Sequence, residues 1–195
     1  MPRKFFCILL NILLLCTSVP AAAGWLIHIE PDQNSITFSL KATLHTVHGT
    51  AAIEASTLQF DPVTGVIFGD IAVSTASTAT GNTKRDKKMH TKVLRSSDYP
   101  RLTLRPHHID GEVSSSGSSR VVLRAEIELQ GKDHAIEIPL EIEIVAGRFT
   151  ATGEFVVPYV EWGLKDPSTF VLRVAKEVPV DVEIEGTIDF GEKER

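Results

Sequence analysis

Alternation of apolar and polar residues with a period of two dominates the second half of this sequence. In residues 120–131 the apolar series alternates with charged and polar residues, and its members are Val121, Leu123, Ala125, Ile127 and Leu129. The same pattern returns in residues 134–144 and 178–190. Because successive side chains of a β-strand point to opposite faces, each run predicts a strand with one apolar face and one charged face.

Short links separate these runs. Gly131–Asp133 lies between the first two, and Ala146–Gly147 precedes a further run over residues 148–157. Links of this length join antiparallel neighbours. Earlier strands are predicted at Ser35–Ala42, Val47–Leu58, Val66–Thr75 and Leu102–Ile109. About eight antiparallel strands without an internal repeat or linker predict a single all-β domain closed into a barrel, because closure removes exposed sheet edges.

Two segments interrupt the alternation. The first is the basic stretch Thr78–Leu94, in which we expect a short helix over Asp86–Leu94 at a crossover between strands. The second is the loop Pro158–Phe170, which is punctuated by glycine and proline.

The N-terminal residues have the pattern of a secretory signal peptide. Arg3 and Lys4 precede the apolar run Phe5–Cys16, and Ala21–Ala23 offers small residues for cleavage. The run is shorter than the roughly 20 apolar residues of a membrane-spanning helix. We therefore expect a signal peptide over residues 1–23 and a barrel domain over residues 24–195, periplasmic or secreted and without a membrane span. A retained or lipid-modified terminus is the alternative.

The positions of the cysteines and the net charge indicate how the domain is stabilised and which partners it can bind. Both cysteines, Cys7 and Cys16, fall within the predicted signal peptide, so a hydrophobic core must stabilise the exported domain. The net charge of the whole chain is −5, whereas a nucleic-acid-binding domain is usually basic. We expect no nucleic-acid partner, and both a monomer and a homodimer remain open.

No catalytic motif is present in the sequence. It has no nucleophile elbow, phosphate-binding glycine loop or metalloprotease helix. Glutamates such as Glu126 and Glu141 lie on the predicted solvent faces of strands, which explains them without a catalytic role. We predict a protein that is not an enzyme and that uses no cofactor.

Histidines are the remaining candidates for metal ligands. His45 and His48 are three residues apart and therefore lie on opposite faces of a strand, and the adjacent His107 and His108 do so as well. We predict no metal site. An enzyme that uses His45, His48 or His90 remains an alternative if these side chains converge on a metal.

An outer-membrane barrel also alternates apolar and polar residues, but with the apolar face toward lipid. The few aromatic residues after the predicted signal peptide and the charged C-terminal end argue against such a barrel.

Several ordered motifs connect this sequence to a known family. They are Trp25, the strand Ser35–Phe38, Val47-His48-Gly49, Thr80–Asn82 with Arg85-Asp86, Ser96–Leu104, the hairpin around Gly131, Glu161–Leu164 and Val178–Gly186. In this order and spacing they resemble the YceI-like family of exported proteins, which have a lipocalin-like barrel and bind polyisoprenoids. Many family members carry a histidine two residues after the Arg-Asp pair, where this chain has Lys88.

The resemblance implies an isoprenoid-type lipid ligand with its tail inside the barrel. The expected tail contacts are the inward apolar residues Phe38, Leu40, Ile71, Leu102, Leu104, Leu123, Ile127, Ile138, Ile142, Phe155, Val182 and Ile184. The expected contacts to the polar head of the lipid are Asn82, Arg85 and Lys88. Two alternatives stay open: Arg85 and Asp86 have a purely structural role, or the barrel is packed solid and acts as a structural or stress-response protein of the cell envelope.

Overall fold

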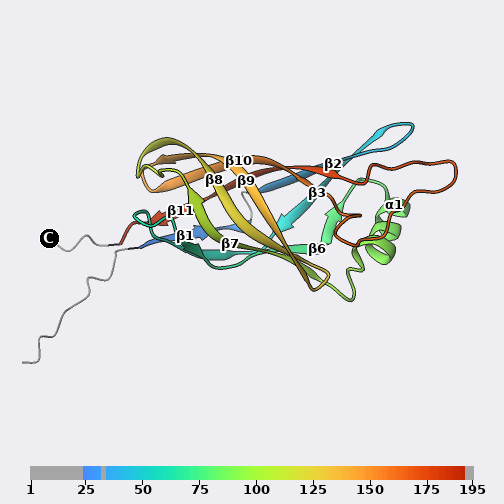
Figure 1. Ribbon diagram of the computed structural model, residues 1–195, viewed down its shortest axis with the longest axis horizontal. Helices are drawn as coiled ribbons and strands as arrows, with labels where there is room; N and C mark the ends of the chain where they lie inside the picture. Colours follow the sequence, from blue (N-terminus) through green and yellow to red (C-terminus); the bar gives the residue numbers. More distant parts are fainter. Residues whose placement is uncertain (1–23, 32–33, 192–195) are drawn as a thin grey trace, which may run out of the picture.

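The computed structural model describes residues 24–31 and 34–191, and these form an antiparallel β-barrel with one helical segment (Figure 1). The predicted signal peptide, residues 1–23, lies outside the described residues. The strands are β1 (Trp25–Ile29), β2 (Ser35–Lys41), β3 (Thr46–Ile53), β4 (Ser56–Phe60), β5 (Ile67–Phe68), β6 (Ile71–Ala79), β7 (Arg101–Asp110), β8 (Gly117–Leu129), β9 (Lys132–Val145), β10 (Arg148–Val157) and β11 (Val178–Asp189). The predicted fold class is confirmed.

Eight strands close the barrel. They follow the order β11-β2-β3-β6-β7-β8-β9-β10, and the pairing of β10 with β11 completes the ring. Strand β11 is shared between two halves of the wall, because Val180–Glu183 pair with β2 and Gly186–Asp189 pair with β1. Strands β1, β4 and β5 thereby form the wall at one end, while β2, β3 and β6 form it at the other.

Two strand predictions need correction, and one strand was missed. The expected strand Val47–Leu58 is two strands, β3 and β4, separated at Glu54-Ala55. The expected strand Val66–Thr75 is likewise β5 and β6, separated at Gly69-Asp70, and β1 was not predicted at all. At each break the chain passes from one half of the wall to the other, since β3 pairs with β2 and β6 whereas β4 pairs with β1 and β5.

The helical segment begins earlier than predicted. Helix α1 spans Thr83–Lys88 and continues as the π-helix η2, Met89–Leu94. The side chain of Asn82 caps α1 by accepting a hydrogen bond from the backbone N–H of Arg85 at 3.1 Å. An Asn at this position satisfies a backbone donor that has no partner within the helix, which sets the helix start three residues before Asp86.

Two glycines allow close approach inside the barrel. A Cβ atom on Gly49 would lie 2.2 Å from the Phe38 ring on the neighbouring strand β2, so only glycine leaves room for that ring. A Cβ atom on Gly186 would lie 2.0 Å from the carbonyl oxygen of His28, where β11 passes between β1 and β10. Close packing therefore explains why glycine stands at the end of each of the motifs Val47-His48-Gly49 and Val178–Gly186.

The apolar faces of the strands point inward, and the charged faces point to solvent. On β8, Leu123 is buried whereas its neighbour Arg124 is exposed. This arrangement is the reverse of the one expected for an outer-membrane barrel. Within the described residues, no helix combines the length and the apolar character needed to cross a membrane.

Candidate functional site

The barrel interior holds a cavity of about 730 Å³. Ligand pockets typically measure about 300–1,000 Å³, so the space is large enough for a small amphiphile. Apolar side chains from strands all around the ring line it. The alternative of a barrel packed solid does not fit this geometry.

The two ends of the interior are packed differently. At the β1 end, Trp25, Phe60 and Phe149 belong to a dense buried core, with Trp25 and Phe60 in edge-to-face contact at 5.5 Å. At the α1 end, inward-facing residues such as Leu40 and Val180 are only half-buried. An inward side chain that water can still reach has fewer packing partners, so the interior is packed more loosely around these residues.

Nearly all residues predicted to contact a ligand line this cavity. All the expected tail contacts, from Phe38 on β2 to Ile184 on β11, are among the lining residues, and so are Arg85 and Lys88. Asn82 is the exception, because it lies outside the cavity and caps α1 instead. The contact of Asn82 with a lipid head stays a prediction.

Polar side chains gather at one end of the lining. They come mostly from the segment that ends β6 and enters α1, and they are Thr75, Thr78, Thr80, Lys84, Arg85 and Lys88, together with His45 from the β2–β3 turn. This end of the barrel carries α1, the β2–β3 turn and the long loop between β10 and β11 (Figure 1). The cavity therefore has an apolar interior and a polar, positively charged mouth.

Arg85 and Asp86 hold the crossover through Thr80. The Arg85 guanidinium donates to the Thr80 hydroxyl and carbonyl oxygens at 2.7 and 2.8 Å. The Asp86 carboxylate accepts from the Thr80 backbone N–H at 3.1 Å and from its hydroxyl. The hydrogen bond from the Thr80 hydroxyl is the main cause that lowers the pKa of Asp86. Both side chains thus have the structural role held open above, while Arg85 also reaches the cavity.

The loop between β10 and β11 closes over part of the mouth. Tyr159 is buried and donates from its hydroxyl to the Ala175 carbonyl at 2.8 Å. Trp162 stacks on His134 at the start of β9, with ring centroids 4.4 Å apart. Across the mouth, the Lys88 ammonium reaches the Pro167 carbonyl at 3.5 Å. The segment Glu161–Leu164 therefore fastens this loop to the barrel.

Sequence reasoning missed part of the lining. Lys84 stands in the same basic stretch as Arg85, and Val180 belongs to the alternating run of β11. Both residues line the cavity and could have been predicted from these sequence patterns. Tyr159, Leu164 and Leu172 come from the irregular loop, and only the tertiary structure brings them to the cavity.

The histidines do not converge. His45 lies at the mouth, His48 is exposed on β3, and His90 contacts the Ser96 hydroxyl at 3.0 Å. Within the described residues, no group of three or more His, Cys, Asp or Glu side chains could hold a metal ion.

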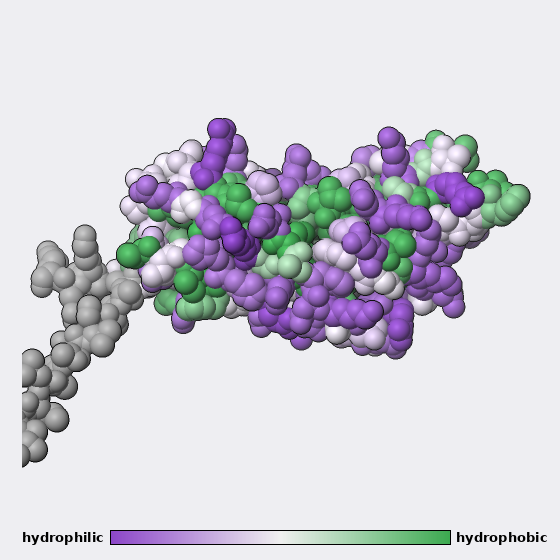
Figure 2. All heavy atoms as spheres, in the orientation of Figure 1, coloured by the Kyte–Doolittle hydropathy of each residue, from purple (hydrophilic) through white to green (hydrophobic). Residues whose placement is uncertain are grey.

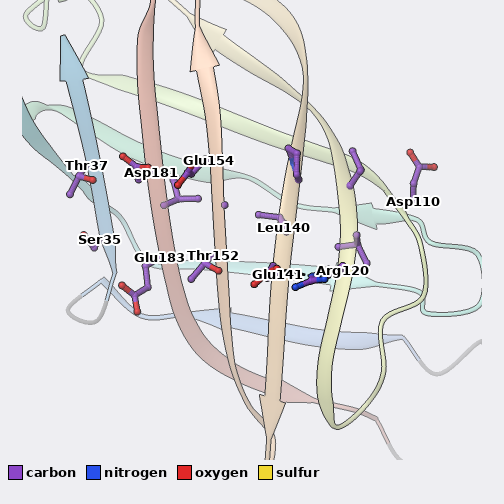
Figure 3. Close-up of a pocket in the computed structure, with 15 residues that line it drawn as sticks. Ser35, Thr37, Asp110, Arg120, Leu140, Glu141, Thr152, Glu154, Asp181 and Glu183 are labelled. Atoms are coloured by element: carbon purple, nitrogen blue, oxygen red, sulfur yellow. Dashed lines mark hydrogen bonds and ion pairs between the residues drawn. The ribbon is translucent and has the colours of Figure 1, made fainter. Parts of the chain in front are cut away.

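A second depression, of about 720 Å³, crosses the outer face of the barrel over β2, β11, β10, β9 and β8 (Figure 3). Its labelled side chains include Asp181, Glu154 and Glu141, and Arg120 pairs with Glu141 at 2.7 Å. These carboxylates are exposed, so the groove suits water better than an apolar chain. We therefore place the functional site inside the barrel.

Comparison with known proteins agrees with this geometry. The model of the YceI-like domain matches residues 28–186. The chain belongs to the YceI-like family. The match spans β1 to β11 and includes the crossover held by Thr80 as well as the loop fastened by Trp162. None of the curated proteins matches the sequence.

Solved structures share the YceI-like barrel. BcnA from Burkholderia cenocepacia is 16% identical, with a TM-score of 0.65 over 82% of this chain and 99% of that one. A polyisoprenoid binding domain from Saccharophagus degradans, implicated in plant cell wall breakdown, is 15% identical, with a TM-score of 0.59 over 85% of this chain and 98% of that one. The YceI protein of Campylobacter jejuni is 16% identical, with a TM-score of 0.53 over 79% and 85% of the two chains. At these identities the likeness concerns the fold.

Proposed function

We propose that this protein is an exported, non-enzymatic lipid-binding protein that holds an isoprenoid-type amphiphile in the barrel and transports or stores it. The observation that carries the proposal is the polarity of the cavity, which is apolar along its length and cationic at the α1 end. The Saccharophagus degradans domain, described as polyisoprenoid binding, supports this choice of lipid class.

Burial of the tail supplies the affinity in this proposal. Each methylene removed from water contributes roughly 0.8 kcal/mol, so ten tail carbons contribute about 8 kcal/mol before ordering costs. Such a free energy corresponds to roughly micromolar affinity.

The polar head of the lipid lies at the mouth, where Lys84, Arg85 and Lys88 line the cavity. Among the described residues, Lys84 has no side-chain hydrogen bond or ion pair, which leaves its ammonium group for an acceptor on the ligand.

The test is native mass spectrometry of the protein purified without detergent from an envelope fraction, followed by solvent extraction of what remains bound. We expect a discrete added mass that is recovered as a prenylated molecule. The protein mass also reports whether residues 1–23 have been removed. A protein that is free of ligand, and remains so after incubation with prenyl quinones, would contradict the proposal.

A matched pair of variants locates the tail. Val180 faces the cavity on β11, and the next residue, Asp181, faces outward. Val180→Trp should fill part of the cavity and abolish lipid uptake, whereas Asp181→Trp should bind lipid as the wild type does. Equal uptake by both variants would show that the tail does not occupy this part of the barrel.

A further inference from the structure

Three large apolar side chains are almost fully exposed at the mouth end of the barrel. Leu44 is 84% exposed, Phe170 98% and Val171 84%, and we call them the apolar tip. Figure 2 shows hydrophobic surface at this extremity, at the right of the view. Exposed apolar residues that gather in one place mark interaction sites more often than scattered ones do.

Hydrogen-bonded turns hold the apolar tip in place. Leu44 sits in the β2–β3 turn, which the Ala42 N–H closes by donating to the His45 carbonyl at 3.0 Å. Phe170 and Val171 sit in a second turn, in which the Thr169 N–H donates to the Leu172 carbonyl at 2.8 Å. Turn positions usually carry Gly, Pro, Asn, Asp or Ser, so bulky apolar residues there are not required by the turns themselves.

The two turns are joined into one surface. The Thr43 N–H donates to the Arg173 carbonyl at 3.0 Å, and the Arg173 N–H donates to the Thr43 hydroxyl at 2.9 Å. The neighbours of the tip residues, among them Ala42, Leu172 and Val174, line the cavity. The apolar tip therefore borders the mouth directly, although its own side chains do not line the cavity.

Cations surround the apolar tip. Exposed basic side chains come from the strand before the first turn, from the loop and from α1, and they are Lys41, Arg173, Lys84, Lys87 and Lys88. Four carboxylates lie on the same helix and loop, Asp86 in α1 and Glu161, Asp166 and Glu177 between β10 and β11, and the basic side chains outnumber them. The charge of this end is thus opposite to the net charge of −5 of the whole chain.

We infer that the mouth end docks on the surface of an anionic phospholipid bilayer, with the apolar tip inserted among the acyl chains near the headgroups. Apolar side chains flanked by lysine and arginine are the features that anchor proteins at such interfaces. A second copy of the chain fits this face poorly, because two cationic ends would repel each other. Docking on a bilayer does not require that the barrel binds a lipid in its cavity. If a lipid is carried, docking lets it enter or leave the cavity without crossing bulk water.

The test is sedimentation of the purified protein with vesicles of phosphatidylcholine alone or mixed with phosphatidylglycerol. The wild type should bind the mixed vesicles more tightly, and salt should weaken binding. The triple variant Leu44→Ser, Phe170→Ser, Val171→Ser should lose at least roughly tenfold in affinity, because it removes the apolar anchor. Replacing Lys41 and Arg173 by Gln should cost about fivefold per cation removed.

The matched control changes exposed apolar residues at the opposite end. Val63 is 87% exposed after β4, and Val145 is 62% exposed at the end of β9. The variant Val63→Ser, Val145→Ser should bind vesicles as the wild type does, and any contribution from the N-terminal segment is the same in all variants. Equal binding to both vesicle types, or undiminished binding by the triple variant, would overturn the inference.

A second measurement places the tip directly. Relative to the wild type, in which Trp25 and Trp162 set the background, the variant Phe170→Trp should show added quenching by brominated lipids in mixed vesicles, whereas Phe68→Trp, on β5, should not. Quenching at both positions or at neither would overturn the inference, as would a dimer that depends on the tip. The triple variant should keep any lipid bound in the cavity, because its substitutions lie outside the lining. A wild type that docks on vesicles but carries no lipid would contradict the proposed function and leave the docking inference intact.

Discussion

A single hydrogen atom in place of a side chain lets the Phe38 ring lie against β3. Gly49 stands directly opposite Phe38, and a Cβ at this position would also lie 2.8 Å from the Ala79 carbonyl oxygen. Gly49→Ala should therefore lower the free energy of unfolding by about 1–3 kcal/mol through overpacking. Urea denaturation measures this effect. Thr50→Ala, at the next and outward-facing position, is the control, and equal loss in both variants would refute the steric explanation.

Tyr159 gives the protein a predictable response to alkaline pH. Burial, and secondarily the charge of Asp166, raises the pKa of Tyr159 to about 12. A tyrosine in the unfolded chain ionises near pH 10, so the unfolded state loses its proton first and stability falls as the pH rises from 10 toward 12. Denaturation at about pH 9 and about pH 11 should show a loss in the wild type that Tyr159→Phe lacks. Parallel losses would show that Tyr159 is not responsible.

At the scale of elements, the crossover from β6 to α1 depends on a side-chain clamp. Asp86 accepts two hydrogen bonds from Thr80, and the lowered pKa of Asp86 means that this stabilisation persists until the pH falls below the ordinary value for an aspartate. Asp86→Ala should cost about 1 kcal/mol per hydrogen bond, mostly as local opening. Amide hydrogen exchange should accelerate in α1 and η2 and not in β8. Asp98→Ala, which removes an exposed ion pair with Arg95, is the control.

At the scale of the whole molecule, a cavity links stability to its occupant. A ligand that binds only the folded state raises the free energy of unfolding by about 2.7 kcal/mol when its free concentration is 100 times the dissociation constant. Protein stripped of lipid should therefore unfold at lower temperature than the reloaded protein. The Val180→Trp variant should not respond to added lipid. A wild type that also fails to respond would argue that the cavity stays empty.

The sequence alone determined which side of each strand faces inward. The alternation along β8, β9 and β11, together with the shorter apolar series of β2, β6, β7 and β10, predicted tail contacts that all line the cavity, because a period of two places alternate residues on one face. The order of the motifs identified the family, and the basic stretch located the polar end near Arg85 and Lys88.

Only the tertiary structure decided where the wall divides and whether its interior is filled. The inward-facing positions change from odd to even numbers between Ile53 and Leu58, which marks a break in the alternation but does not show that the chain changes there to the other half of the barrel. Likewise, Leu40 and Trp25 are both apolar and both face inward, but one borders open space and the other a packed core. Alternation specifies the direction of a side chain, whereas a cavity depends on what the opposite wall leaves unfilled. The unfilled volume is a property of the closed barrel, because it depends on side chains from all the strands around the ring.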